Sequence, residues 1–504
     1  MLTHSHVSGM STDGREPGRW KMLNLAWVSF FLTFVVWYNL GAFSTTIARV
    51  LKLSKEQSQV LMLCNLALTI PARIGVGMLV DRFGPRKVYS WLLALASIPC
   101  FAMAVSNQFY QMVICRLLIS CVGAGFVVGI RMVAEWFDAR DIGTAEGIYG
   151  GLGNFGMAAA TFGLPLLALP FGPVNGWRYA IAISGALCLI WAFVFYAMAI
   201  DSPPGKEFKR PKKRGALEVT SHGDLLGLIF MQVPMVLCLG VTTWRLVRVK
   251  FLPMGLSYFI YALLAALLVQ QITKILKVNR SVIEKAVVPE DEKYSFGQVA
   301  ILSLCYAVTF GGELAVEQML PGYFEKMFSV SVVIAGVMGA GFAFANFIAR
   351  PLGGILGDYV GRKPIMIVTL LGSAIGFYLI SMINSQWPLW AAMTLVVVVG
   401  LFLMAGNGAN FCIAPLIRKP LTGQIAGLIG AYGSVGSVAF MTILLLTNAY
   451  TFFISMAVTG TVAFACCFLI KEPARTLAPQ AIANNKPADE PLPETSEPAP
   501  AFAI

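Results

Sequence analysis

Charged residues are scarce in this sequence, and most of them stand between long apolar runs. Asp, Glu, Lys and Arg make up 12% of the 504 residues, whereas 57% are hydrophobic. Apolar stretches of the ~20 residues that a helix needs to cross a bilayer recur along nearly the whole chain. This composition excludes a soluble domain and predicts an all-α polytopic membrane protein. The net charge of +12 does not indicate nucleic-acid binding, because most basic residues flank the apolar runs.

Other signals of chemistry are also missing. The 3 histidines (His4, His6 and His222) lie outside the apolar runs, so we expect no histidine proton relay in the membrane. The 10 cysteines lie in apolar runs without the spacing of metal ligands, and we interpret them as small hydrophobic residues. There is no Gly-x-x-x-x-Gly-Lys-Ser/Thr loop for binding ATP. We expect no catalytic residue, no metal, no cofactor and no enzyme activity.

The positions of the apolar runs predict fourteen membrane spans. They lie near residues 23–45, 58–80, 88–106, 109–133, 144–170, 178–200, 224–243, 251–273, 296–320, 332–356, 364–383, 388–413, 422–448 and 450–470. Because the number is even, both termini face one side, together with the basic loops 81–87, 206–214, 362–363 and 418–419. The positive-inside rule makes that side the cytoplasm. We expect an integral multi-pass protein of the plasma (inner) membrane, with its first run acting as an uncleaved signal anchor.

One pair of runs fits this topology less well. Residues 224–243 and 251–273 are joined by 244–250, which contains three positive charges. If both runs cross the membrane, that connection is external and opposes the positive-inside rule. We favour two spans. The alternative is a hairpin that dips into the cytoplasmic face and returns.

The two halves of the chain repeat one another. Arg73 precedes Asp81 by eight residues, as Arg350 precedes Asp358, at an offset of 277. The glycines of a second run recur at an offset of 280, so one duplication explains both repeats. Six spans, an insert and six more spans is the layout of the major facilitator superfamily. We therefore expect two six-helix pseudo-repeats with about two extra membrane segments between them.

This layout predicts the boundaries of the parts. We expect a cytoplasmic N-terminal segment (1–22), an N-terminal six-helix bundle (23–200), a central linker with a hydrophobic hairpin (201–295), a C-terminal six-helix bundle (296–470) and a tail (471–504). The tail is rich in Pro, Ala and Glu and has no periodicity, which predicts disorder. It is a candidate site for a cytoplasmic regulator.

A short charged loop follows the second core span in each half. Both loops resemble the signature loop of the superfamily, because each has an aspartate, a glycine and a basic pair in the same order. Such loops are expected to tie neighbouring helix ends together and so to bias which side the carrier faces. The predicted gating residues are Asp81, Arg82, Arg86, Asp358 and Arg362. The alternative is that these charges only set topology beside a tight turn.

Arg73 and Arg350 lie inside apolar runs, where a charge is costly and indicates function. Eight residues at ~1.5 Å each place each guanidinium about 12 Å from the helix end, inside a hydrocarbon core of about 30 Å. The pseudo-symmetry would bring the two side chains face to face across a central cavity. Because arginine presents a planar fork of donors and keeps its charge, the pair is typical of a site for a planar oxyanion. The alternative is that each forms a buried structural ion pair.

Glycine-rich runs at 147–156 and 427–436 carry further candidates for this site. Glycines spaced three residues apart let helices pack closely, which explains most of them without a ligand. Asn154, its counterpart Ser434 and Asn407 are polar residues in otherwise apolar helices. We expect each either to donate to a bound anion or only to a neighbouring backbone carbonyl.

Together these features resemble the nitrate/nitrite porters of the major facilitator superfamily, over about residues 22–200 and 295–470. The similar segments are 71–75, the glycine-rich 150–156 and 430–436 (the family's two nitrate signatures), Tyr306 with Phe310, and 406–408. In that family a pocket holds nitrate between two arginines and aromatic rings. The resemblance thus implies a site made of Arg73, Arg350, Phe126, Tyr306 and Phe310. Flat rings suit a flat, weakly hydrated anion, which argues against sulfate and phosphate.

Acids in the seventh core span extend the resemblance to the high-affinity nitrate permeases of cyanobacteria, algae, fungi and plants. Glu313 lies three residues after Phe310 and shares its helix face. Two arginines and one nitrate keep an excess positive charge, which an exchanger tolerates because it never returns empty. In a symporter, Glu313 would balance that charge and take part in binding a coupling proton or sodium ion. The alternative is that Glu313 is a structural partner of one arginine.

Arg131 and Glu135, spaced four apart, are expected to form a local helix pair. The function that we expect overall is a secondary active transporter that imports nitrate, and nitrite, by alternating access with ion-coupled symport. The alternatives are a nitrate/nitrite antiporter, a carrier of the same superfamily for another small anion or an organic anion or drug, and an anion sensor that does not transport.

Overall fold

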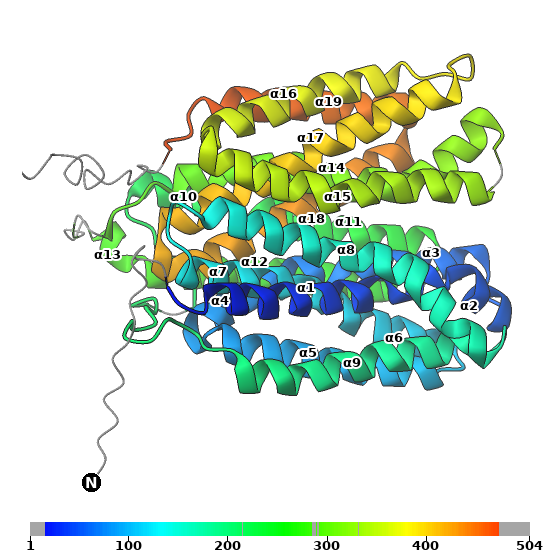
Figure 1. Cartoon of the computed structure of the whole chain (residues 1–504), viewed down its shortest axis with the longest axis horizontal. Helices are drawn as coiled ribbons and strands as arrows, with labels where there is room; N and C mark the ends of the chain where they lie inside the picture. Colours follow the sequence, from blue (N-terminus) through cyan, green and yellow to red (C-terminus); the bar gives the residue numbers. More distant parts are fainter. Residues whose placement is uncertain (1–15, 214, 285–288, 290–291, 331, 473–504) are drawn as a thin grey trace, which may run out of the picture. The chain divides into compact units, whose positions relative to one another are not determined.

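The computed structural model of the protein describes residues 16–213, 215–284, 289, 292–330 and 332–472. The expectations for residues 1–15 and for the tail from 473 onward lie outside the described residues. The long helices run along one common direction (Figure 1). Within the described residues, thirteen helical segments are long and apolar enough to cross a membrane. Helix α15, of 28 residues, lies at the tenth predicted span but is not one of the thirteen.

The N-terminal half contains six spans, four of them uninterrupted helices (α1, α5, α8 and α9). Its elements are α1 (Arg19–Ala42), α2 (Ser44–Val50), α3 (Lys55–Ala67), α4 (Thr69–Phe83), α5 (Pro85–Val105), α6 (Phe109–Ser120), the 3-10 helix η1 (Cys121–Ala124), α7 (Gly125–Trp136), α8 (Ile142–Ala168), the 3-10 helix η2 (Leu169–Phe171) and α9 (Gly176–Met198). One span is broken at Leu68, between α3 and α4, and another at η1. Both breaks lie near the candidate site and free backbone carbonyls there.

The C-terminal half repeats this arrangement. Its elements are α14 (Phe296–Phe328), α15 (Val332–Tyr359), α16 (Arg362–Ser381), α17 (Leu389–Ile417), the 3-10 helix η4 (Lys419–Leu421), α18 (Thr422–Leu446) and α19 (Ala449–Cys467). Across the halves, α4 packs on α18 and α8 packs on α15. The expectation of two six-helix pseudo-repeats is confirmed.

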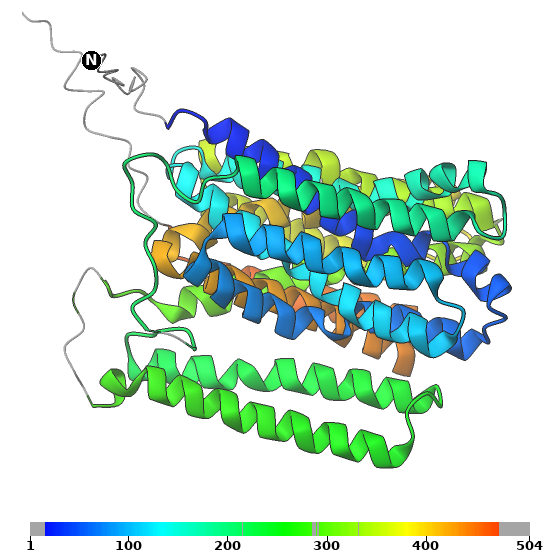
Figure 2. The ribbon, with the colours of Figure 1, turned by 90° about the horizontal axis from the view of Figure 1, so that it is seen from below.

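The segment between the halves contains α10 (His222–Phe230), α11 (Gln232–Arg248), α12 (Met254–Val278) and the short α13 (Arg280–Ile283). Figure 2 shows α10–α11 and α12 as two long green helices along one side of the bundle. Twenty-five residues in α12 extend ~37 Å, more than a hydrocarbon core of ~30 Å. Apolar side chains of α12 such as Phe259 and Val269 are about two-thirds exposed, as expected of a surface that faces lipid. Both features support two spans over a short dipping hairpin.

Glycines allow the two halves to approach closely at matching places. A Cβ atom at Gly77 of α4 would overlap the carbonyl oxygen of Gly423 in α18. A Cβ atom at Gly354 of α15 would likewise overlap the carbonyl oxygen of Gly143 in α8. These contacts lie near the end of the bundle that carries the basic loops 81–87, 206–213, 358–363 and 418–419, which we call the basic end.

Candidate functional site

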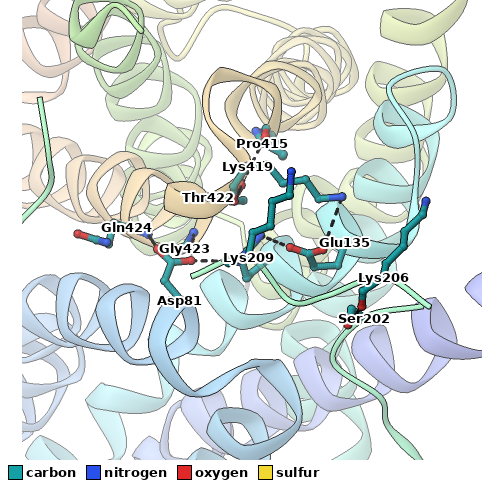
Figure 3. A network of polar contacts seen from close by, with 11 residues as sticks. Asp81, Glu135, Ser202, Lys206, Lys209, Pro415, Lys419, Thr422, Gly423 and Gln424 are labelled. Carbon is teal, nitrogen blue, oxygen red and sulfur yellow. Dashed lines mark hydrogen bonds and ion pairs between the residues drawn. The ribbon is translucent and has the colours of Figure 1, made fainter. Parts of the chain in front are cut away.

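Asp81, at the end of α4, links the two halves at the basic end. Its carboxylate accepts hydrogen bonds from the backbone N–H groups of Gly423 (2.8 Å) and Gln424 (2.9 Å) in the first turn of α18 (Figure 3). It also pairs with the Nε of Arg131 at 3.0 Å. A helix N-terminus offers free N–H donors and a partial positive charge, so an aspartate is well suited to this position.

Asp358, at the end of α15, makes the pseudo-symmetric link. It accepts from the backbone N–H groups of Gly143 (3.0 Å) and Thr144 (2.6 Å) and from the Thr144 hydroxyl (2.9 Å), in the first turn of α8. Arg362 lies 3.5 Å from the same carboxylate and donates to the carbonyl oxygen of Ala139 across the halves. The two predicted loop aspartates thus form two matching contacts that close the basic end.

The Arg131–Glu135 pair is present, at 2.5 Å, but it is not only local. Arg131 also binds Asp81, and Glu135 lies 3.5 Å from Lys419 of the other half (Figure 3). Arg131 in addition donates to the carbonyl oxygen of Lys209 in the linker, at 2.7 Å. Spacing along one helix indicated the first contact only, because the others join segments that are far apart in the sequence.

The remaining predicted gating residues contact their own half. Arg82 is exposed and lies over the ring of Phe83 at 4.7 Å. Arg86 donates from its Nε to the carbonyl oxygen of Tyr196 and from its backbone N–H to Asp201, both at 2.7 Å. Partial burial raises the pKa of Asp201 above its ordinary value, and the hydrogen bond from Arg86 opposes that rise. These contacts brace the α4–α5 turn within the N-terminal half.

Arg73 is fully buried in α4. Its Nε donates to the carbonyl oxygen of Gly123 at 3.1 Å, and its Nη1 donates to that of Gly430 in α18. Gly123 belongs to η1, whose helix break leaves this carbonyl free to accept. Among the described residues, the third guanidinium nitrogen, Nη2, has no hydrogen-bond partner.

Arg350 occupies the matching place in α15 and is equally buried. Its Nη2 donates to the hydroxyl of Tyr306 at 3.2 Å, while its Nη1 finds no partner in the described part of the chain. No carboxylate of residues 16–472 that the structure describes forms an ion pair with either arginine. This geometry does not support the alternative that the two arginines are structural ion pairs.

The aromatic residues implied by the resemblance lie against the arginines, and Phe310 lies near both of them. The guanidinium carbon of Arg73 is 5.1 Å from the centre of the Phe310 ring, and that of Arg350 is 5.9 Å from the same ring. The rings of Tyr306 and Phe310 stack at 4.9 Å with an interplanar angle of 3°, and Phe126 continues the stack at 6.2 Å and 7°. Two cations and three parallel rings therefore meet at the centre of the bundle.

The polar candidates differ in what they contact. Asn154 donates to the carbonyl oxygen of Gly150, one turn earlier on its own helix, at 2.7 Å. Gly150 in turn lies against the Arg350 side chain. The Ser434 hydroxyl is fully buried, and no described group pairs with it. Asn407 donates to Glu313. The side-chain amide of Asn154 is therefore used by a backbone carbonyl on its own helix, whereas the Ser434 hydroxyl can still donate a hydrogen bond.

Glu313 is fully buried in α14 and is held by two amides. The Nδ2 of Asn346 donates to one carboxylate oxygen, and the Nδ2 of Asn407 donates to the other. Arg350 is near enough to attract this carboxylate, although the two do not form a direct ion pair among the described contacts. The arrangement stabilises a negative charge beside the two-arginine site. Asn346, which the sequence analysis did not select, is one of its two donors.

Three further buried side chains near the site were missed. Trp37 of α1 lies 6.0 Å from the guanidinium carbon of Arg73. Arg116 of α6 is buried, and its Nε and Nη1 have no partner among the described residues. Glu146 of α8 is buried with both carboxylate oxygens unpartnered in the same set. The signal that could have found Arg116 and Glu146 is the cost of a charge inside an apolar run.

The fold and the site, with paired cations between two pseudo-symmetric halves, are those of a secondary carrier. The model of the Major Facilitator Superfamily matches residues 26–279 and 302–501. The chain is 44% identical over 470 residues to "Nitrate/nitrite transporter NrtP" of Nostoc punctiforme, covering 92% of this chain and 94% of that protein. It is 43% identical over 506 residues to the protein of the same name from Picosynechococcus sp., with the same coverage.

Solved structures show the same fold at low identity. A double-Trp mutant of the xylose carrier XylE covers 92% of this chain and 98% of its own, with a TM-score of 0.61 and 17% identity. The chain therefore belongs to the major facilitator superfamily and, within it, to the nitrate/nitrite porter family. It is an integral multi-pass membrane transport protein, and not an enzyme.

Proposed function

We propose that this protein imports nitrate, and nitrite, across the plasma membrane by alternating access, in symport with a cation. One observation carries the proposal. Two buried arginines, one from each half, flank the ring of Phe310, and each keeps one guanidinium nitrogen without a partner among the described residues. A buried donor left unpaired is costly, so the site is built to receive acceptor oxygens.

The shape and charge of the site favour a small planar anion. A guanidinium presents coplanar N–H donors that match the oxygens of a planar oxyanion, and the flat faces of Phe310, Tyr306 and Phe126 lie beside these donors. The rings also attract the guanidinium groups and hold them in place. The nitrate/nitrite transporters at 44% and 43% identity support the same substrates.

The conformation of the protein supports alternating access. Asp81 and Asp358 close the basic end. A cavity of about 750 Å³ lies toward the other end, lined by residues of both halves and of α11, such as Leu40, Met441 and Arg245. With the basic end in the cytoplasm, as the positive-inside rule requires, this conformation is closed on the cytoplasmic side. Both termini are then cytoplasmic.

Glu313 favours symport over obligate exchange. An empty site with two arginines and no acid would carry two positive charges during its return, and burying them is costly. A buried carboxylate that accepts hydrogen bonds from Asn346 and Asn407 would offset one of these charges. The cation that accompanies the anion, a proton or sodium, offsets the charge of nitrate in each cycle.

Uptake into proteoliposomes of the purified full-length protein tests this function. We expect labelled nitrate to accumulate under an inward proton or sodium gradient and to exchange with internal nitrite. Arg73→Lys and Arg350→Lys should each abolish saturable uptake, because lysine keeps the charge and loses the planar fork. Lys277→Gln, an exposed change on α12, serves as the control. Near-normal uptake by either arginine variant would remove that arginine from the site, and exchange without gradient-driven uptake would indicate an antiporter.

A further inference from the structure

Glu146 is a buried acid that the nitrate site does not use directly. It lies in the second turn of α8, where α8 packs on α15 and α17 of the other half, and its exposed fraction is 2%. Among the described residues, no donor reaches either carboxylate oxygen. An ionised carboxylate without donors is expensive to bury, whereas a neutral carboxyl is tolerated. Glu313, with two amide donors, is in the opposite situation.

The surroundings of Glu146 contain one cation of the nitrate site. Arg350 of α15 attracts the carboxylate. The other titratable groups around it are Tyr149 on its own helix, Cys412 on α17, Asp358 on α15 with Arg362 on α16, and the Arg19–Asp141 pair between α1 and the start of α8. The Tyr149 hydroxyl is engaged with the Phe126 carbonyl oxygen and with Tyr89. Arg350 is thus the cation that attracts both the Glu146 carboxylate and a bound anion.

We propose that Glu146 is the binding site of the coupling proton, and that Glu313 is a fixed counter-charge. This inference rests on the proposed function and makes its coupling ion a proton. When nitrate binds Arg350, its oxygens accept the hydrogen bonds of the guanidinium, and the Glu146 carboxylate binds a proton that enters from the same side as nitrate. When nitrate leaves, the O–H bond of Glu146 breaks, the proton goes to water and the carboxylate faces Arg350 again.

The charges of the central site balance in both states that change from one facing side to the other, the loaded carrier and the empty carrier. In the loaded carrier, Arg73 and Arg350 are offset by Glu313 and nitrate, while Glu146 is neutral. In the empty carrier, ionised Glu146 replaces nitrate as the second negative charge. Each state crosses the membrane barrier without excess charge, so empty return is possible. Arg116 and Glu317 both act on Tyr38 and are not part of this charge balance.

The position of Glu146 accounts for release on the basic side. It stands between the Asp358 contact at Gly143 and Thr144 and the place where Gly147 and Gly150 meet Arg350. Opening the basic end separates α8 from α15 and gives water access to Glu146 directly after the Asp358 link breaks. Nitrate and its proton therefore leave toward the same side.

The test uses full-length protein in proteoliposomes and separates exchange from net transport. Glu146→Gln replaces the carboxyl by an amide that is always neutral, as Glu146 is in the loaded carrier. Nitrate–nitrite counterflow uses only the loaded carrier, so it should stay within about twofold of wild type. Net nitrate uptake driven by a proton gradient should fall at least roughly tenfold, a barrier higher by ~1.4 kcal/mol, and nitrate should no longer move protons into vesicles that contain a pH-sensitive dye. Glu146→Asp should restore the proton flux. Glu325→Gln, which removes an exposed acid of α14, should leave both assays unchanged.

Each outcome decides a different claim. If wild type does not exchange nitrate for nitrite at all, the proposed function fails irrespective of Glu146. If wild type couples to sodium alone, or if Glu146→Gln still moves protons with nitrate, the function stands and this inference is overturned. Loss of counterflow together with net uptake in both Glu146 variants, with normal elution on size exclusion, would make Glu146 structural and would also overturn it.

Discussion

Asp358→Asn should shift the protein toward the conformation that is open at the basic end. The aspartate accepts three hydrogen bonds from the first turn of α8 and lies 3.5 Å from Arg362. Asparagine keeps one acceptor and loses the charge. A charge at a helix N-terminus contributes up to ~2 kcal/mol when partly buried, and charged hydrogen bonds are about twice as strong as neutral ones. A loss of ~2 kcal/mol increases the open population about 30-fold.

Alkylation of Cys412 measures this population directly. Its sulfur lies 2.7 Å from the position that a Cβ atom on Gly143 would take. The side chain is fully buried in the closed interface. Opening the basic end exposes it, so a maleimide should label Cys412 about 30-fold faster in Asp358→Asn, as measured by mass spectrometry. Cys188, buried within the N-terminal half, is the internal control and should keep its rate. Unchanged Cys412 labelling, or equal acceleration at Cys188, would refute the role of Asp358 as a closing contact.

Three other changes test separate parts of the account. Glu313→Gln leaves one uncompensated charge in both loaded and empty carriers, so counterflow and net uptake should fall together; a loss of net uptake alone would make Glu313 the coupling site instead. Phe310→Leu removes the ring between the arginines and should weaken nitrate binding roughly tenfold, as expected for cation–π contacts of ~1–2 kcal/mol; calorimetry showing unchanged affinity would contradict this. Gly354→Val inserts a side chain where α15 touches Gly143 and should accelerate Cys412 labelling more than Gly341→Val, a position with open space around it; equal rates would argue against close packing there.

The sequence alone predicted the fold well, because its strongest signals are local. Apolar runs of the right length predicted the spans, and the repeat of arginine and aspartate at matching spacing predicted two related halves. Asp81 and Asp358 were predicted as loop residues that contact helix ends, and each caps a helix of the other half.

The sequence did not predict which side chains contact one another across the halves. Arg131 was interpreted as a local partner of Glu135, although it also binds Asp81. Asn346 was not selected, although it holds Glu313 with Asn407. Glu146 was overlooked because it lies near the start of a helix, where an acid usually faces solvent. Such contacts depend on the rotation of each helix about its axis, which apolar periodicity does not determine when nearly every position is apolar.

Binding of nitrate to the purified protein tests the central claim, which is that two buried arginines form a site for a planar anion. Calorimetric titration should show saturable nitrate binding by wild type, with nitrite competing and sulfate not competing. Arg73→Lys and Arg350→Lys should each remove that binding while the protein stays folded. Sulfate competing as well as nitrite, or nitrate affinity that survives in both arginine variants, would contradict the account.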